Sequence, residues 1–250
     1  MGIIKTFKRK ISYIRNVLSY KKLIIRNKNI IITGSNSGIG LSLLNQLSGS
    51  NRILSLVNKN SKEVDKIIDD KNMVIKCEFN NLDNLLNFKE KIINFKANII
   101  FNCAATFGDE DKFIENIDLK NYQKVINVNS LSQFSIIQSC LKSKSLEIIV
   151  NISSDMGSIT SNKDGGNYFY RSTKSFSNSI FKNLSIDLKE KKINVFFIHP
   201  GSVKTKLNSG GLMMTDVVAR KIINICAEKQ KKFSKEISLQ DQIFLKELYP

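Results

Sequence analysis

Several residue types that define protein classes are scarce in this sequence: its 250 residues include no Trp, one His, two Pro and four Cys. One histidine and four scattered cysteines do not supply the ligand set of a zinc site, so we predict no metal site. Because so few cysteines do not make a disulfide scaffold, we expect reduced thiols in a cytoplasmic protein. The sequence has no apolar run of the ~18 residues that a membrane-spanning helix needs, and no apolar core of a signal peptide.

Acidic residues are missing from the first 62 positions, and the whole chain has 39 Lys and Arg against 22 Asp and Glu, a formal net charge of +17. Lysine supplies 33 of these 39 basic residues, whereas sites that recognise phosphate favour the bidentate fork of Arg. The basic residues are not interleaved with aromatic ones, and they match no known nucleic-acid module. We therefore predict no dedicated nucleic-acid partner.

Residues 1–26 have the pattern of a basic amphipathic helix. Apolar residues recur there at steps of three and four, and basic residues fill much of the remainder. Two interpretations stay open: a helix that makes peripheral contact with an anionic membrane or an acidic partner, or a helix that packs on its own domain or on a twin subunit. We expect residues 1–26 to form an N-terminal extension and residues 27–250 to form one domain.

From residue 28 onward, short apolar runs alternate with longer helical patterns. The runs are apolar throughout, which is typical of parallel strands buried on both faces of a sheet. The alternation predicts an α/β fold, a Rossmann-like doubly wound parallel sheet in a single domain. The expected strands are 29–32, 53–57, 73–77, 98–101, 146–152 and 194–198, with a weakly indicated seventh in 233–245; the expected helices are 41–47, 61–70, 82–95, 119–141, 170–190 and one that includes 221–227.

A glycine-rich loop, TGSNSGIG at residues 33–40, stands between the first strand and the first helix. Glycines let the backbone turn tightly and let a pyrophosphate approach the start of the helix. The amides and the dipole at that helix end stabilise its negative charge. The loop therefore predicts a dinucleotide site built from Gly34, Ser35, Asn36, Ser37, Gly38, Ile39 and Gly40.

The end of the second strand indicates which dinucleotide is bound. NAD sites usually carry an acidic residue there that binds the ribose 2′-hydroxyl, but this chain has Asn58 and Lys59. A lysine attracts a 2′-phosphate, which favours NADP(H) over NAD(H). The alternative is that Lys59 is one more solvated lysine in a lysine-rich chain.

A Y-x-x-x-K pattern places Tyr170 and Lys174 on one face of a predicted helix. A free tyrosine has a pKa of about 10, and a nearby ammonium group favours the phenolate and lowers that pKa. Ser154 follows a predicted strand 16 residues before Tyr170. These three residues together indicate a proton-transfer site at the carboxyl edge of the sheet.

With these motifs, residues 28–230 resemble the short-chain dehydrogenase/reductase family in its single-domain branch. Three further segments match the family: residues 101–105 (FNCAA, where the family has NNAG), 128–130 (VNS) and 199–205 (HPGSVKT). The resemblance implies a catalytic set of Asn129, Ser154, Tyr170 and Lys174. It also implies cofactor contacts from Glu78, Asn102, Ala104, Tyr170, Lys174, Pro200, Gly201, Val203 and Thr205.

The implied reaction is hydride transfer between nicotinamide and a small carbonyl or alcohol substrate. In the family pattern, Ser154 orients the substrate oxygen and Tyr170 gives or takes its proton. Lys174 lowers the pKa of Tyr170 and binds the nicotinamide ribose, and Asn129 holds a water that extends the proton path. His199 is expected to serve in packing. The alternative is an idle relative that binds cofactor as a sensor or scaffold, although an intact catalytic set argues against it.

In this family the helix of the catalytic tyrosine often packs against a twin subunit, so we expect a homodimer or homotetramer. The face of that helix with Ser175, Ser179 and Asn183 carries small or polar residues among Phe176, Ile180 and Leu184.

Overall fold

The computed structural model describes residues 23–108 and 114–231. Six parallel strands form one sheet in the order β3-β2-β1-β4-β5-β6. This is the order of a doubly wound dinucleotide-binding sheet, and its direction reverses between β1 and β4. The strands are β1 (Asn29–Thr33), β2 (Arg52–Val57), β3 (Met73–Lys76), β4 (Ile99–Asn102), β5 (Ile148–Ile152) and β6 (Asn194–Ile198).

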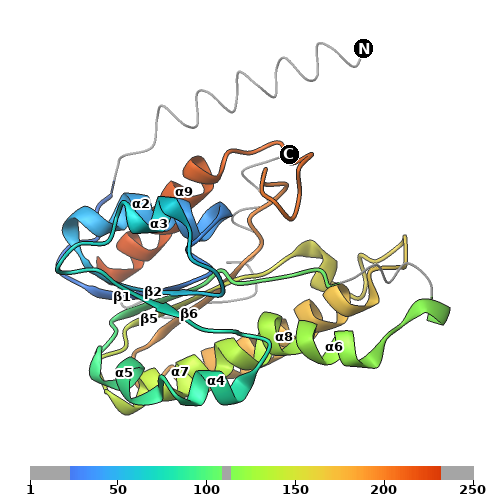
Figure 1. Cartoon of the computed structure of the whole chain (residues 1–250), viewed down its shortest axis with the longest axis horizontal. Helices are drawn as coiled ribbons and strands as arrows, with labels where there is room; N and C mark the ends of the chain where they lie inside the picture. Colours follow the sequence, from blue (N-terminus) through green and yellow to red (C-terminus); the bar gives the residue numbers. More distant parts are fainter. Residues whose placement is uncertain (1–22, 109–113, 232–250) are drawn as a thin grey trace, which may run out of the picture.

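Helices cover both faces of the sheet and bury it between two apolar layers (Figure 1). One face carries α2 (Gly38–Leu47), α3 (Lys62–Asp65) and α9 (Thr215–Lys231). The other carries α4 (Leu82–Leu86), α5 (Lys89–Asn94), α6 (Leu119–Ile126), α7 (Ser132–Lys142) and α8 (Tyr168–Asp187). The predicted Rossmann-like α/β fold is confirmed. The weakly indicated strand in 233–245 lies outside the described residues.

Three predicted helices are shorter or broken in the structure. The helix expected over 61–70 is only α3, which ends at Asp65; a turn follows in which the Asp69 carboxylate accepts the N–H groups of Lys71 and Asn72. The helix expected over 82–95 divides into α4 and α5. The one expected over 119–141 is divided by a π turn at Asn127–Leu131, where Asn127 donates its side-chain amide to the carbonyl of Asn80 (2.8 Å).

Residues 23–26, which the sequence assigns to the extension, pack on the domain. Ile25 is buried in the apolar layer, and its carbonyl accepts a hydrogen bond from the Asn51 side chain (2.9 Å). The Leu23 N–H donates to Asn224 of α9 (3.2 Å). The rest of the predicted extension, and its membrane interpretation, fall on residues 1–22, outside the described part of the chain. Within the described ranges, no helix is long and apolar enough to span a bilayer.

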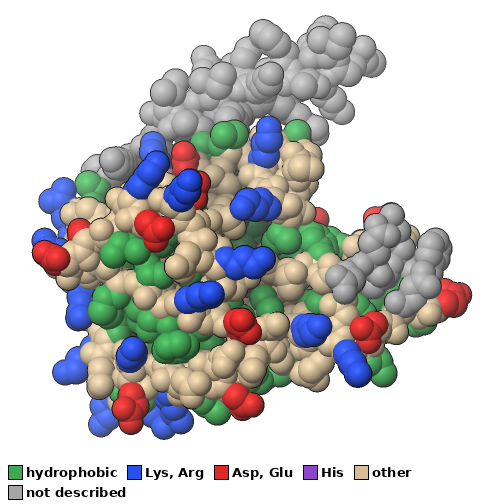
Figure 2. Space-filling view, in the orientation of Figure 1, with side chains coloured by type: hydrophobic (Ala, Val, Ile, Leu, Met, Phe, Trp, Pro, Cys, Tyr) green, Lys and Arg blue, Asp and Glu red, His purple; other side chains and the backbone are tan. Residues whose placement is uncertain are grey.

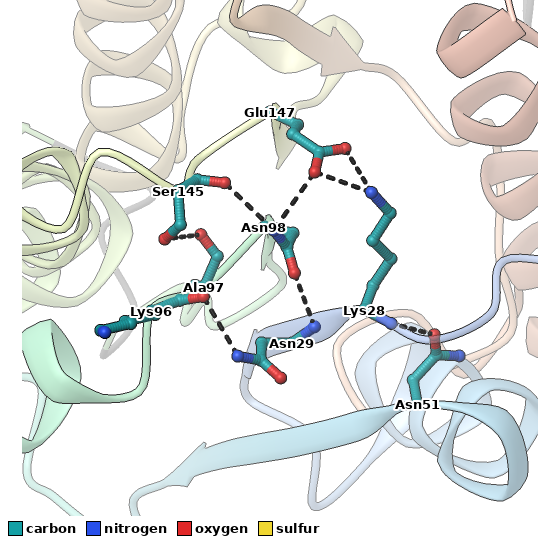
Figure 3. A network of polar contacts seen from close by, with 8 residues as sticks. All are labelled: Lys28, Asn29, Asn51, Lys96, Ala97, Asn98, Ser145 and Glu147. Carbon is teal, nitrogen blue, oxygen red and sulfur yellow. Dashed lines mark hydrogen bonds and ion pairs between the residues drawn. The ribbon is translucent and has the colours of Figure 1, made fainter.

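The amino ends of β1, β4 and β5 are tied together by a polar network centred on Asn98 (Figure 3). The Asn98 side chain accepts the N–H of Asn29 (2.9 Å) and donates to the carbonyl of Ser145 (3.1 Å) and to Glu147 (3.2 Å). Glu147 also pairs with Lys28 (2.7 Å). A single amide thus satisfies backbone groups at the starts of two segments that are far apart in the sequence.

Replacing Asn98 by alanine is expected to lower the free energy of unfolding by about 1–3 kcal/mol, because it leaves partly buried backbone groups without partners. Lys28→Ala is the control and should cost less than about 1 kcal/mol, since its ion pair is partly exposed to solvent. Urea unfolding of both variants measures the difference. Equal costs would show that Asn98 does not organise this edge.

Candidate active site

The carboxyl ends of the strands border a cavity of about 1110 Å³ at the point where the strand order reverses. Ligands of open α/β sheets bind at such a position. The structure brings most of the predicted site residues to this cavity. Its lining includes Gly34, Asn36, Ser37, Gly38, Ile39, Gly40, Asn58, Lys59, Glu78, Ala104, Ser154, Tyr170, Lys174, Pro200, Gly201, Val203 and Thr205.

Three predicted residues are buried and are not part of the lining. Ser35, Asn102 and Asn129 are at most 1% exposed. Among the described residues, the side-chain oxygen of Ser35 and the side-chain amide of Asn102 have no hydrogen-bond partner, and the contact of these two residues with a cofactor stays a prediction. Asn129 acts through its neighbours, as described below.

The glycine loop has the shape that a pyrophosphate requires. Gly34 and Gly38 have φ of +66° and +56°, which favour glycine. A Cβ on Gly40 would lie 2.5 Å from the Gly34 carbonyl oxygen, and one on Gly34 would lie 2.9 Å from the Ala104 backbone. The loop therefore packs closely on its own helix start and on the segment after β4, with its open side towards the cavity. These residues fit a dinucleotide.

At the end of β2, the Asn36 side chain donates hydrogen bonds to the Asn58 side chain and to the Lys59 carbonyl, both at 3.3 Å. These bonds join the glycine loop to the turn where the sequence predicts the ribose of the cofactor. The Lys59 side chain is exposed. It can therefore turn towards a ligand in the cavity.

Lys174 is a buried cation beside Tyr170. It is 2% exposed, its Nζ donates to the carbonyl of Ile152 at the end of β5 (2.8 Å), and it lies 5.5 Å from the centre of the Tyr170 ring. Burial lowers the pKa of Lys174 to about 8, because a charged group loses its hydration in the interior. The sequence spacing thus brings the two residues together as predicted.

The expected lowering of the Tyr170 pKa by Lys174 is not found. Burial raises the pKa of Tyr170 to about 12, a hydrogen bond with Ser154 opposes the rise, and the charge of Asp155 adds to it. Desolvation wins because the phenol is enclosed, partly by Phe107, whose ring stacks on it with centroids 4.1 Å apart. Tyr170 therefore holds its proton at neutral pH.

Asn129 lies in the π turn between α6 and α7, and its side chain forms two hydrogen bonds with the backbone of Thr106. Its oxygen accepts the Thr106 N–H (2.8 Å), and its nitrogen donates to the Thr106 carbonyl (2.9 Å) and to the Thr173 hydroxyl (3.0 Å). Next to Phe107, Gly108 has a φ of +80° and no room for a Cβ against Val125. Asn129 therefore positions the segment that places Phe107 on Tyr170.

Ser154 begins a short turn, and the residue after it is hydrogen-bonded to His199, the only histidine of the chain. Its hydroxyl accepts the N–H of Met156 (3.2 Å), which caps the short 3₁₀ turn Asp155–Gly157. The N–H of Asp155 donates to Nδ1 of His199 (3.1 Å), and His199 lines the cavity. His199 therefore fixes the turn after Ser154 in addition to the packing role that the sequence suggests.

Sequence reasoning missed three contributors to the site: Thr33, Phe107 and Lys206. Thr33 is fully buried, and its hydroxyl accepts the N–H groups of Cys103 and Ala104 (3.0 and 3.1 Å), which fixes the segment after β4. The position of Thr33 at the end of an apolar strand was the feature of the sequence that could have indicated this role. Nothing local marks Phe107 or Lys206, because their neighbours in space are distant in sequence.

A Rossmann sheet with a glycine loop beside a Tyr–Lys pair defines a class of protein, the enzymes that hold a dinucleotide and carry out redox chemistry next to it. Within this class the sequence matches the family described as short chain dehydrogenase over residues 28–211. The chain belongs to the short-chain dehydrogenase/reductase family and is an NAD(P)-dependent oxidoreductase. The family membership that the motifs predict is confirmed.

Individual relatives support the same assignment. The chain is 28% identical over 193 residues to a 3-oxoacyl-[acyl-carrier-protein] reductase of Buchnera aphidicola (73% of this chain, 76% of that protein). It is 29% identical over 199 residues to an L-rhamnose 1-dehydrogenase (NADP(+)) of Thermoplasma acidophilum (75% and 77%). The carbonyl reductase Sniffer of D. melanogaster has a similar fold, with a TM-score of 0.71 and 24% identity over 86% of this chain and 94% of that one.

Proposed function

We propose that the protein reduces a carbonyl group of a small molecule with NADPH, through Asn129, Ser154, Tyr170 and Lys174. The observation that supports this most is the position of Tyr170: its phenol lines the cavity, interacts with Ser154, and lies beside Lys174, whose Nζ is 5.5 Å from the centre of the Tyr170 ring. A protonated phenol is a general acid, which suits reduction of a carbonyl better than oxidation of an alcohol. The test is carbonyl-dependent oxidation of NADPH by the wild-type protein and by Tyr170→Phe.

In the proposed mechanism, the Ser154 hydroxyl donates a hydrogen bond to the substrate oxygen and holds it near Tyr170. The Tyr170 hydroxyl transfers its proton to that oxygen as negative charge develops there. The ammonium of Lys174 stabilises the phenolate that remains, and its bond to the Ile152 carbonyl fixes its position. Asn129 keeps Thr106 and Phe107 in place against the Tyr170 ring. When bound, the nicotinamide cofactor supplies the hydride.

We further propose NADPH as the preferred cofactor, because Asn58 and Lys59 stand where NAD sites carry an acid. A named relative is NADP(+)-linked, and a short chain dehydrogenase from Burkholderia cenocepacia with a similar fold (TM-score 0.70, 19% identity, 82% of this chain and 91% of that chain) was crystallised with NADP. Lysine also offers the charge that a 2′-phosphate needs.

Lys59→Ala is expected to weaken NADPH binding by about tenfold, the loss of one charge-assisted hydrogen bond, and to leave NADH binding unchanged. Titration of each cofactor against the purified protein measures both dissociation constants. Equal affinity of the wild-type protein for NADPH and NADH would refute the preference.

We also propose a homo-oligomer that uses the exposed face of α8. Tyr168, Phe176 and Ile186 are 39%, 40% and 59% exposed on this helix, whereas Leu184 and Ile180, which the sequence suggests for this face, pack on the core. Phe176→Glu should convert a dimer or tetramer to monomers in light scattering. A monomeric wild-type protein would contradict the proposal.

A further inference from the structure

The segment that follows the HPGSVKT motif folds into a closed loop. The Lys204 N–H donates to the Met213 carbonyl (2.8 Å), and Thr205 and Asn208 exchange backbone hydrogen bonds of 3.0 and 3.2 Å. Gly211 packs so tightly on the backbone of Val203 and Lys204 that any Cβ there would overlap it. The backbone of this loop therefore has a defined position.

The loop lies across the glycine loop of the cofactor site. The methyl group of Thr205 is 3.4 Å from the position that a Cβ on Gly38 would occupy. The next residue, Lys206, is exposed and lines the cavity together with Asn58 and Lys59. The loop thus brings a second lysine to the cavity that contains the turn after β2.

Glu63, in the first turn of α3, interacts electrostatically with Lys206. A backbone hydrogen bond and the Ser61 hydroxyl are the main causes that lower the pKa of Glu63, and the charge of Lys206 adds to them. Because α3 begins three residues after Lys59, Lys206 extends towards the end of the cavity where the sequence predicts the cofactor ribose. Figure 2 shows many other Lys and Arg side chains spread over one face of the molecule among acidic and apolar ones, so position and not charge alone distinguishes Lys206.

We infer that Lys206 is a second binding residue for the 2′-phosphate of NADPH, acting together with Lys59 from a separate segment of the chain that lines the same cavity. The inference rests on the proposed preference for NADPH. A phosphate monoester carries close to two negative charges, which two lysines from separate segments balance.

The test compares Lys206→Gln with Lys204→Gln, which removes the same charge from an exposed lysine of the same loop outside the cavity lining. Dissociation constants for NADPH and NADH are measured by titration of the full-length protein. Lys206→Gln should weaken NADPH binding about three- to tenfold and leave NADH unchanged. Lys204→Gln should change neither by more than about twofold.

Two results overturn the inference and leave the proposed cofactor preference intact. In the first, Lys206→Gln has the NADPH affinity of the wild-type protein. In the second, Lys206→Gln weakens the binding of NADPH and of NADH by the same factor. The same holds if Lys204→Gln weakens NADPH binding as much as Lys206→Gln does. A wild-type protein that binds both cofactors equally overturns the preference and the inference together. In that case Lys59→Ala has no selective effect either, which distinguishes the two failures.

Discussion

Replacing Tyr170 by phenylalanine is expected to lower kcat for carbonyl reduction by about 10²- to 10⁴-fold, the usual contribution of a general acid. The variant keeps the ring, its stacking on Phe107 and its place beside Lys174. Only the hydroxyl that interacts with Ser154 is lost. Cofactor affinity should therefore change little, and the loss should appear in the chemical step.

The matched control is Tyr168→Phe, which removes a hydroxyl from the first turn of the same helix, on a side chain that is 39% exposed. It should keep activity within about twofold, as for surface changes away from a site. NADPH oxidation is followed over a panel of aldehydes and ketones. If wild type and Tyr170→Phe were equally inactive over the whole panel, while both bound NADPH, the protein would be a cofactor-binding relative without this chemistry.

Lys174→Met is expected to abolish activity and at the same time to stabilise the fold. Burial lowers the pKa of Lys174 from 10.5 to about 8, which at about 1.4 kcal/mol per unit corresponds to about 3 kcal/mol of destabilisation at neutral pH. Methionine fills a similar volume without charge. The lost hydrogen bond from this charged group to the Ile152 carbonyl offsets about 1.5–3 kcal/mol of the gain, so the free energy of unfolding should rise by about 1 kcal/mol.

The pH dependence identifies the cause of that gain. Because the folded pKa of Lys174 lies below the unfolded value, the unfolded chain binds more protons between pH 8 and 10.5. The stability of the wild-type protein therefore rises with pH over this window relative to Lys174→Met, and the difference between the two shrinks. Urea unfolding at pH 7 and pH 10 measures it, with the exposed Lys189→Met as control. A difference that stays constant with pH would rule out the buried charge as its source.

Much of the fold follows from local patterns in the sequence. Runs such as residues 30–32 are apolar on both faces, and the strands they predict occur in the structure within one or two residues. The helix predicted over 119–141 occurs as α6 and α7 joined by a π turn, in which the buried side chains of Asn127 and Asn129 bond to distant backbone groups. Periodicity does not report such tertiary bonds.

The predicted site shows the same division. The spacing of Tyr170 and Lys174 is a property of one helix, so the sequence predicts their proximity correctly. The pKa of Tyr170 depends on how completely neighbouring segments enclose it, and residue types do not reveal that quantity. Phe107 and Lys206 reach the cavity through loops whose paths depend on the packing of Gly108 and Gly211. Only the folded arrangement identifies them.

The polar network at Asn98 lies at the amino edge of the sheet, opposite the cavity. The polar network that stabilises the sheet and the cavity with the candidate catalytic residues therefore lie at opposite ends of the same strands. For protein engineering, this separation means that loops at the carboxyl edge can be randomised to obtain new substrate ranges while thermal tolerance is retained. Improvements made at the amino edge should in turn transfer to any variant selected for a new reaction.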